Sequence, residues 1–335
     1  MKPDIPIFGR PSLGPFGRAW RVLPALAISA AVVAASQASA DPYAQPARLV
    51  RLADGRAINL VCSGRGSPTV LLESGFGAGA FAWGQVQPIL ASRTHVCSYD
   101  RAGYGFSDVG PMPRDGAAIA RDLDAALRKA GERGPFVIVG HSAGGLYARL
   151  FAARRHKDAV GLVLVDTSVP FQDRRFAAVF GSGAGGLDGP RRHPAACLQA
   201  AEKGSIAALE AEGCVPKKPG RARIAASRPG VWRTQVSELD TIFTTTSEQV
   251  NRTRPILKDV PTIVLTASPT GVAAGQEDPA AAVWQSLHRE IAAGAFRGEQ
   301  RIVKSSHLMM IDRPEVVAGA ALELVDATRK SGRSQ

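Results

Sequence analysis

The feature that most constrains the fold is a sharp turn centred on Ser142. An apolar run, Phe136–Val139, leads directly into Gly140-His141-Ser142-Ala143-Gly144, and a helical pattern follows over Leu146–Arg155. A buried strand that turns at once into a helix crowds the residues beside the turn, so small residues are needed there. A serine at the apex of such a turn is typical of a nucleophile elbow. Ser142 is therefore a candidate catalytic nucleophile, and the alternative is a glycine-rich turn with an idle serine.

Strand and helix patterns alternate along most of the chain. Strands are expected at Ala57–Cys62, Thr69–Glu73, His95–Tyr99, Phe136–Val139, Val160–Val165, Thr262–Thr266 and Arg301–Lys304. Helices are expected at Ala117–Ala130, Leu146–Arg155, Ala280–Ala293 and Pro314–Thr328. Alternation of this kind is typical of an α/β fold, in which helices cover both faces of a mostly parallel sheet.

The stretch from Val169 to Asp259 interrupts this alternation. It has no convincing strand pattern, and it contains a glycine-rich segment at 181–189 and helical patterns at Ala195–Ala211 and Val231–Val250. We expect residues 169–259, called the cap below, to form a helical insertion over the active end of the sheet. The alternative is an ordinary surface excursion. The core would then comprise residues 41–168 and 260–330.

The first forty residues resemble a secretory signal peptide. Basic residues precede an apolar stretch, Val22–Ala35, and Ala38-Ser39-Ala40 is a small-residue cleavage site. The apolar stretch is shorter than the ~20 residues that a membrane span needs, although an uncleaved anchor is the alternative. We expect an exported chain, periplasmic or secreted, with no stable membrane insertion after cleavage.

The chain is basic, with a formal net charge of +12. Its arginines are dispersed, and no basic patch interleaved with aromatic residues indicates nucleic-acid binding. A basic balance could favour anionic surfaces or substrates, but a solubilising surface charge is the simpler interpretation.

Four cysteines lie in the part expected to be exported, and an even number in an oxidising compartment favours two disulfides. Sequence alone does not choose among the three possible pairings. Spacing and placement favour Cys62–Cys97 in the core and Cys197–Cys214 in the cap. Because no Cys-x-x-Cys spacing occurs, we expect no metal site.

A serine hydroxyl needs a base to take its proton, and His307 is the best candidate among six histidines. It follows the last expected strand and precedes the last helix, so it should lie at the carboxyl end of the sheet. The carboxylate that orients this imidazole is expected to be Asp166, which ends the strand at 160–165. Asp278 or Glu277, in the loop after the next strand, is the alternative.

Backbone N–H groups must also stabilise the negative charge that develops on the substrate oxygen. The residue after the nucleophile, Ala143, supplies one donor. The loop after the strand at 69–73 should supply the other, and Phe76 is the expected donor there. The same loop matches a dinucleotide fingerprint, Gly75-x-Gly77-x-x-Ala80, with Asp100 about twenty residues on. Dinucleotide binding is therefore the alternative function of this loop, but we expect no cofactor.

Together these residues resemble the α/β-hydrolase superfamily over about residues 47–328. The resemblance rests on Tyr99–Asp108, on the elbow at Gly140–Gly145, and on His307 followed by Asp312-Arg313-Pro314. It implies an eight-stranded sheet in the order 1-2-4-3-5-6-7-8, with the cap inserted after strand six. In that order the strands of Cys62 and Cys97 are neighbours, which supports their pairing.

The chain departs from the family pattern at two points. Ser74-Gly75 stands where His-Gly is common, and the usual acid after strand seven would fall near Thr270, which is why Asp166 is preferred. Members with dehalogenase-like or epoxide-hydrolase-like activity carry Asp as nucleophile, so Ser142 argues against those activities. We expect a serine hydrolase acting on a small acyl substrate, such as a carboxylic ester. An amide or peptide hydrolase resembling an aminopeptidase, or a non-catalytic binding protein, is the alternative, and the oligomeric state is open.

Overall fold

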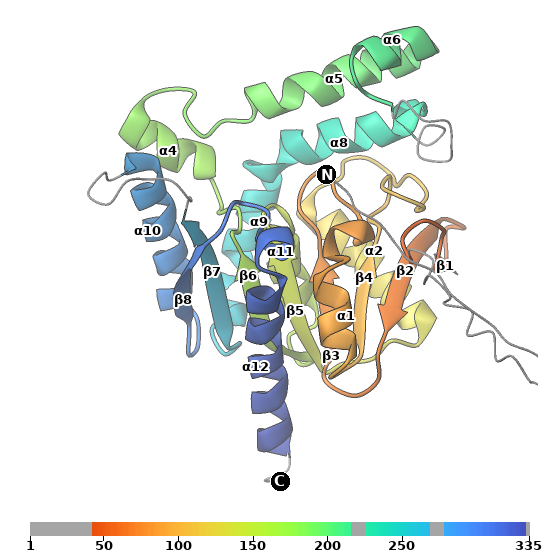
Figure 1. Ribbon diagram of the computed structural model, residues 1–335. Coiled ribbons are helices and arrows are strands. Elements are labelled where there is room, and N and C mark those ends of the chain that lie inside the picture. The colour runs from red at the N-terminus through yellow and green to blue at the C-terminus, as the bar shows by residue number, and fades with distance from the viewer. Residues whose placement is uncertain (1–41, 216–225, 269–277, 333–335) are drawn as a thin grey trace, which may run out of the picture. The chain divides into compact units, whose positions relative to one another are not determined.

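A computed structural model of the chain describes residues 42–215, 226–268 and 278–332. Its sheet has eight strands in the order β1-β2-β4-β3-β5-β6-β7-β8, as expected (Figure 1). β2 is antiparallel to both β1 and β4, and the other neighbouring strands are parallel. The strands are β1 (Arg48–Arg51), β2 (Ala57–Ser63), β3 (Thr69–Glu73), β4 (Val96–Tyr99), β5 (Phe136–His141), β6 (Ala159–Val165), β7 (Thr262–Ser268) and β8 (Glu299–Lys304).

Helices cover both faces of this sheet. They are η1 (Ala80–Trp83), α1 (Val86–Ala91), α2 (Gly116–Ala130), α3 (Gly144–Arg154), α10 (Pro279–Ala293), α11 (Met309–Asp312) and α12 (Pro314–Gly332). In β5, Phe136 and Ile138 pack with the α2 and α3 side, whereas Val137 and Val139 pack with the α1 and α12 side. Burial on both faces explains why the central strands are continuous apolar runs in the sequence.

The described part of the cap is helical, and it follows β6 as expected. Its helices are α4 (Gln172–Phe180), α5 (Asp188–Glu202), α6 (Ile206–Ala211), α8 (Pro229–Ile242), α9 (Thr245–Thr253) and η2 (Arg254–Leu257). Figure 1 shows α4, α5 and α8 beyond the end of the sheet at which β5 and β6 finish. The exact boundaries between core and cap stay a prediction.

Two expected cap helices are each divided in the structure. The helix expected over Ala195–Ala211 breaks at Gly204, which has a φ of 66°, and the Ser205 side chain then caps α6 by accepting from Ala208 N. The helical region expected over Val231–Val250 is divided at Phe243 and Thr244 into α8 and α9. Helical periodicity continues across such breaks because apolar residues on both sides face the same core. Sequence patterns also missed β1, α1 and α4.

Both disulfides favoured by placement form. Cys62 and Cys97 face each other across β2 and β4, and Cys197 of α5 is bonded to Cys214, which follows α6. The first crosslink lies within the sheet, and the second joins two segments of the cap. Each therefore closes a loop within its own part of the fold, which limits the conformational freedom of the unfolded chain.

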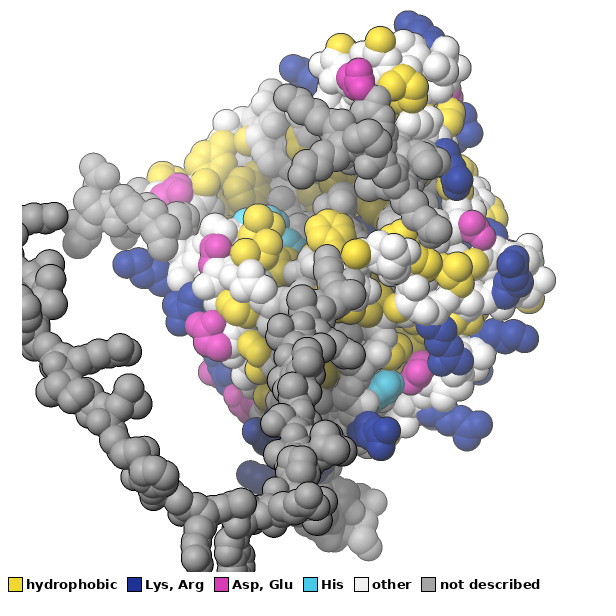
Figure 2. Space-filling view, turned by 45° about the vertical axis from the view of Figure 1, so that its right-hand side comes forward, with side chains coloured by type: hydrophobic (Ala, Val, Ile, Leu, Met, Phe, Trp, Pro, Cys, Tyr) yellow, Lys and Arg dark blue, Asp and Glu magenta, His cyan; other side chains and the backbone are white. Residues whose placement is uncertain are grey.

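The expected signal peptide, residues 1–40, lies outside the described residues. No helix in the described part of the chain is long and apolar enough to span a membrane. Lys and Arg side chains are scattered over the visible face of the molecule in Figure 2. This dispersal agrees with the interpretation of the basic charge as a surface property.

Candidate active site

Ser142 lies at the junction of β5 and α3 in a strained backbone conformation. Its φ is 53°, in the left-handed region that side chains rarely adopt. Its N–H donates to the Val165 carbonyl at 3.1 Å, and its carbonyl accepts from Ser168 N at 2.9 Å. A Cβ at Gly145 would collide with the side chain of Thr167, so that glycine is required by the close packing of the turn. Neighbouring strands and loops therefore hold the elbow in its strained form.

The side chain of His307 lies between those of Ser142 and Asp166. Its Nε2 is 3.0 Å from Ser142 Oγ, and its Nδ1 is 2.6 Å from Asp166 Oδ2. Because a carboxylate accepts, Nδ1 carries the proton, and Nε2 of the neutral ring is left to accept from the serine hydroxyl. Ser142 is half-buried and His307 is exposed, so the hydroxyl can be reached from solvent.

Asp166 follows β6 and is almost completely buried. Its second oxygen, Oδ1, accepts from Ala267 N at 2.9 Å and from Trp284 Nε1 at 2.7 Å. Burial raises the pKa of this carboxyl, but the hydrogen bonds from His307, Trp284 and Ala267 outweigh burial and hold the pKa below its usual value. Asp166 therefore stays ionised beside the imidazole.

The alternative acid, Asp278, has a different contact. It caps the N-terminus of α10, where its Oδ1 accepts from Ala280 N at 2.9 Å. Glu277 lies outside the described residues. Of the two described candidates, only Asp166 contacts His307.

The loop expected to hold the substrate oxygen packs directly against the elbow. A Cβ added at Gly75 would lie 3.2 Å from Ser142 Cβ. Neither Phe76 N nor Ala143 N donates to another atom of residues 42–215, 226–268 or 278–332. Both backbone donors therefore remain available to a bound molecule.

Arg101 is a part of the site that sequence reasoning did not identify. Its guanidinium donates to the Ser74 carbonyl at 2.6 Å and to the Gly75 carbonyl at 2.9 Å, immediately before Phe76. It also pairs with Glu73 at 3.0 Å and with Glu238 of α8 at 3.2 Å. One fully buried side chain thus links the loop after β3 to the cap. The sequence around Arg101 is part of the family resemblance, but its partner on α8, Glu238, lies 137 residues away along the chain.

His141 positions His307 through the backbone. Its Nε2 donates to the His307 carbonyl at 2.8 Å, and the two rings lie 4.7 Å apart. Burial, with a smaller contribution from the His307 charge, lowers the pKa of His141 to about 4. His141 is therefore a neutral donor that anchors the loop of His307.

Residues that the dinucleotide alternative would require have a structural role within the fold instead. Asp100 is buried, and its carboxylate accepts from Asn59 Nδ2 at 2.9 Å, Ala80 N at 2.8 Å and Phe106 N at 3.0 Å. The glycine-rich loop leads into η1, which has four residues, and so lacks the long helix that cradles a pyrophosphate. Asp100 braces two loops of the fold instead of presenting a free carboxylate.

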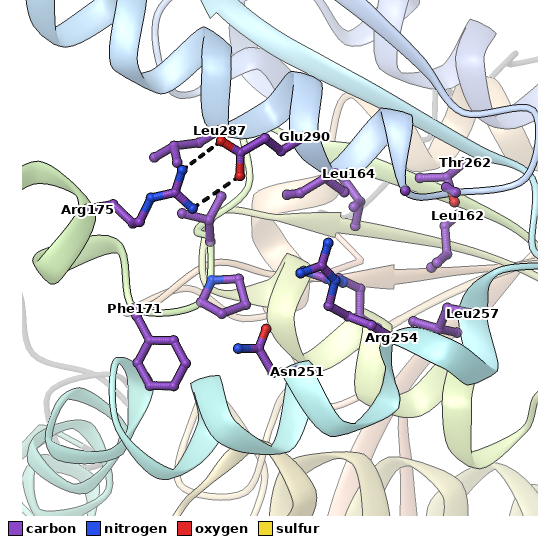
Figure 3. A pocket seen from close by; sticks show the side chains of 16 residues that line it. Leu162, Leu164, Phe171, Arg175, Asn251, Arg254, Leu257, Thr262, Leu287 and Glu290 are labelled. Carbon is purple, nitrogen blue, oxygen red and sulfur yellow. Dashed lines mark hydrogen bonds and ion pairs between the residues drawn. The ribbon is translucent and has the colours of Figure 1, made fainter.

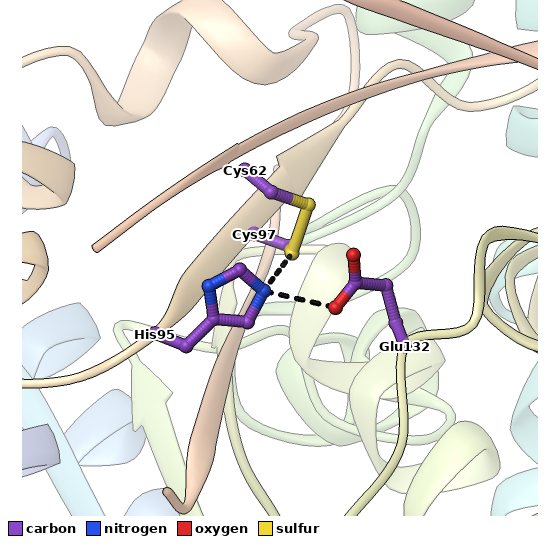
Figure 4. A group of neighbouring side chains, drawn as sticks. All are labelled: Cys62, His95, Cys97 and Glu132. Carbon is purple, nitrogen blue, oxygen red and sulfur yellow. Dashed lines mark hydrogen bonds and ion pairs between the residues drawn. A yellow bond between two sulfur atoms is a disulfide. The ribbon is translucent and has the colours of Figure 1, made fainter. Parts of the chain in front are cut away.

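Two groups of described residues have the composition of a metal site. One joins Cys62, His95, Cys97 and Glu132, and His95 Nε2 lies 2.9 Å from Glu132 Oε2 (Figure 4). The other comprises His193, Cys197 and Cys214. In both groups the two sulfur atoms are joined in a disulfide, and a disulfide offers no thiolate to a metal ion.

Solved structures share this fold at low sequence identity. The esterase from Exiguobacterium antarcticum aligns with a TM-score of 0.58 at 15% identity, covering 83% of this chain and 98% of that one. A hydrolase from Pseudomonas aeruginosa aligns with a TM-score of 0.54 at 20% identity, covering 83% and 97%. These likenesses concern the fold.

The chain is also similar in sequence to curated proteins and to a family model. The protein named "Probable oxidoreductase EphD" from Mycobacterium bovis is 26% identical over 310 residues, covering 84% of this chain and 50% of that one. An uncharacterized Bacillus subtilis protein is 29% identical over 121 residues, covering 36% and 37%. This chain spans half or less of the length of these curated relatives. The model of the alpha/beta hydrolase family matches residues 70–321, most of the chain, so the protein belongs to that family.

Proposed function

We propose that this hydrolase cleaves a carboxylic ester or a related acyl bond through an acyl-enzyme on Ser142. The observation that carries the proposal is the continuous hydrogen-bonded series from Ser142 Oγ through the His307 ring to the Asp166 carboxylate, at 3.0 and 2.6 Å. A neutral imidazole oriented by a buried carboxylate is the arrangement that activates a serine hydroxyl.

The reaction follows from these contacts. His307 Nε2 takes the hydroxyl proton while Ser142 Oγ bonds to the acyl carbon, and the oxygen of the substrate becomes an oxyanion near Phe76 N and Ala143 N. His307 then gives that proton to the departing alcohol as the bond between carbon and leaving oxygen breaks. In the second half, His307 takes a proton from water, the water oxygen attacks the acyl carbon, and Ser142 leaves with the proton returned to it. The products are an alcohol and a carboxylic acid.

Amide hydrolysis is the second candidate function. The same groups would have to protonate an amine leaving group, so the described site is compatible with either bond. Initial rates on p-nitrophenyl acyl esters of graded length and on aminoacyl p-nitroanilides would separate the two. A non-catalytic binding protein would hydrolyse neither, and its Ser142 would not react with a fluorophosphonate probe.

Removal of the nucleophile tests the proposal directly. We expect Ser142→Ala to lower ester turnover by a factor on the order of 10⁴–10⁶, because the remaining groups act through the serine oxygen. The variant should also lose fluorophosphonate labelling while its circular dichroism spectrum is unchanged. Ester turnover close to that of the parent protein would reject the mechanism.

The acid assignment is checked in the same assay with a matched pair of variants. Asp166→Asn should lower kcat by about 10⁴-fold, because the imidazole loses the acceptor that holds its tautomer. Asp278→Asn should retain activity, because asparagine caps a helix about as well as aspartate. If only Asp278→Asn lost activity, the role given to Asp166 would be wrong.

We further propose that the chain is exported after cleavage behind Ala40. The two disulfides support this localisation, because structural disulfides persist mainly in oxidising compartments. Expression of the full chain in a bacterial host, followed by N-terminal sequencing of the cell-envelope and secreted fractions, should give a protein that begins at Asp41. Recovery only of protein that begins at Met1, with free thiols, would contradict export.

A further inference from the structure

A cavity lies apart from the candidate active site. It has a volume of about 160 Å³ and is bounded by β6, α3, α10 and η2, with residues 169–171 at the entrance to the cap. Ser142, His307 and Asp166 are not among its lining residues. The apolar part of its wall includes Leu162, Leu164, Leu257 and Leu287, which are labelled in Figure 3, and Ile291 also lines the cavity.

Arg149 on α3 lines this cavity without a partner for its charge. The residue is only 6% exposed, and its Nη1 is completely buried with no hydrogen-bond partner. Among the described residues, no hydrogen bond or ion pair joins the Arg149 guanidinium to any other group. By contrast, the neighbouring Arg154 and Arg155 of the same segment both pair with Asp124.

The other charged groups around the cavity do not compensate Arg149. Arg254 adds a second positive charge, and burial, followed by Arg254, lowers the pKa of Arg149 to about 10. Glu290 is the single acidic residue of the described lining, and both of its oxygens are paired with Arg175, at 2.6 and 3.1 Å (Figure 3). The described lining therefore combines three guanidinium groups with one carboxylate that is already paired.

A buried charge without a partner costs several kcal/mol, and this cost is offset when an anion binds beside it. A planar guanidinium matches the two oxygens of a carboxylate, and the leucine and isoleucine side chains of the wall favour a ligand with a hydrocarbon body over a fully hydrated ion. A dry cavity of about 150 Å³ accommodates benzene in another protein, so an aromatic carboxylate has a suitable size. We propose that this cavity binds a small carboxylate with an apolar body, whose charge is paired with Arg149.

Calorimetric titration of the full protein with benzoate tests the proposal. Benzoate should bind, and benzyl alcohol, which has a similar body without the charge, should bind at least about tenfold more weakly, since a charged hydrogen bond is worth about 1.5–3 kcal/mol. In Arg149→Leu, benzoate affinity should fall at least about tenfold. In the control Arg154→Leu, on the same helix, benzoate affinity should be unchanged.

A second variant and a stability measurement keep the test decisive. Arg254 is exposed, so Arg254→Gln should stay folded and weaken benzoate binding severalfold. Arg149→Leu should melt at the same temperature as the parent or higher, because it removes an uncompensated buried charge. Equal benzoate affinity in the parent protein and Arg149→Leu would overturn the proposal, because the binding would then not depend on Arg149. Binding of inorganic phosphate in preference to benzoate would overturn the choice of a carboxylate.

The proposal is independent of the serine chemistry. Ser142→Ala should bind benzoate at the Arg149 cavity with the affinity of the parent protein. In the parent protein, ester cleavage without benzoate binding would overturn the cavity proposal alone. Benzoate binding without cleavage of any ester would overturn the proposed hydrolase function alone.

Discussion

Two histidines lie in the candidate active site and form different contacts. His307 is exposed and touches both Ser142 and Asp166, whereas His141 is buried and donates to the His307 backbone. The sequence distinguished them only by position, because His141 adjoins the serine. Burial is what separates their chemistry, since a buried imidazole stays neutral and serves as a hydrogen-bond donor.

The low pKa of His141 predicts acid sensitivity. Its pKa is about 4 in the folded protein against a usual value of 6.5, so the unfolded chain binds more protons between these pH values. The free energy of unfolding should therefore fall as pH decreases from 6.5 toward 4, by about 2–3 kcal/mol from this residue. Above pH 6.5 both states are neutral and the effect vanishes.

Urea denaturation of the parent protein and His141→Gln at pH 7 and pH 4.5 measures this effect. Gln can keep the donor to the His307 carbonyl and does not titrate. The loss of stability between the two pH values should be smaller in His141→Gln by about 2–3 kcal/mol. Equal losses in the two proteins would show that His141 does not cause the sensitivity.

At the scale of elements, buried side chains connect α8 of the cap with the loop after β3. Arg101 contacts the Ser74 and Gly75 carbonyls on one side and Glu238 on the other, and the Tyr104 hydroxyl also donates to Glu238 at 3.0 Å. The backbone that carries Phe76 N is therefore held by the same side chain that anchors the cap. We therefore expect a change in the position of α8 to alter the position of Phe76 N as well.

Arg101→Lys tests the coupling. A lysine ammonium cannot reproduce the planar set of contacts, so the loop should lose its exact placement. We expect kcat on p-nitrophenyl esters to fall about 10–100-fold with a smaller change in KM, because oxyanion contacts act mainly in the transition state.

Arg114→Lys is the matched control, because Arg114 is also buried and pairs with Asp122 at 2.7 Å, outside the site. It should lower thermal stability and leave kcat close to that of the parent. A similar fall in kcat for both variants would show that Arg101 contributes to general stability and does not specifically position the loop after β3.

At the scale of the whole molecule, the central sheet could be predicted and parts of the cap could not. Strands buried on both faces are short apolar runs such as Phe136–Val139, and these patterns are unambiguous where helices alternate with them. In the cap, short non-helical segments separate amphipathic helices. Hydrophobic periodicity does not reveal an interruption such as the one at Gly204. β1 and α4 were missed because each is short or largely exposed.

The sequence alone determined the alternation of strands and helices, the elbow at Ser142, and the few histidine and acidic residues that could act with this serine. These depend on local spacing, which a linear chain carries in full. Only the tertiary structure decided that Asp166 rather than Asp278 contacts His307 and that Arg101 joins the loop after β3 to α8. It also decided that Arg149 is buried with no counterion among the residues that the structure describes. Such relations depend on which side chains meet after folding, and distance along the chain does not encode distance in space.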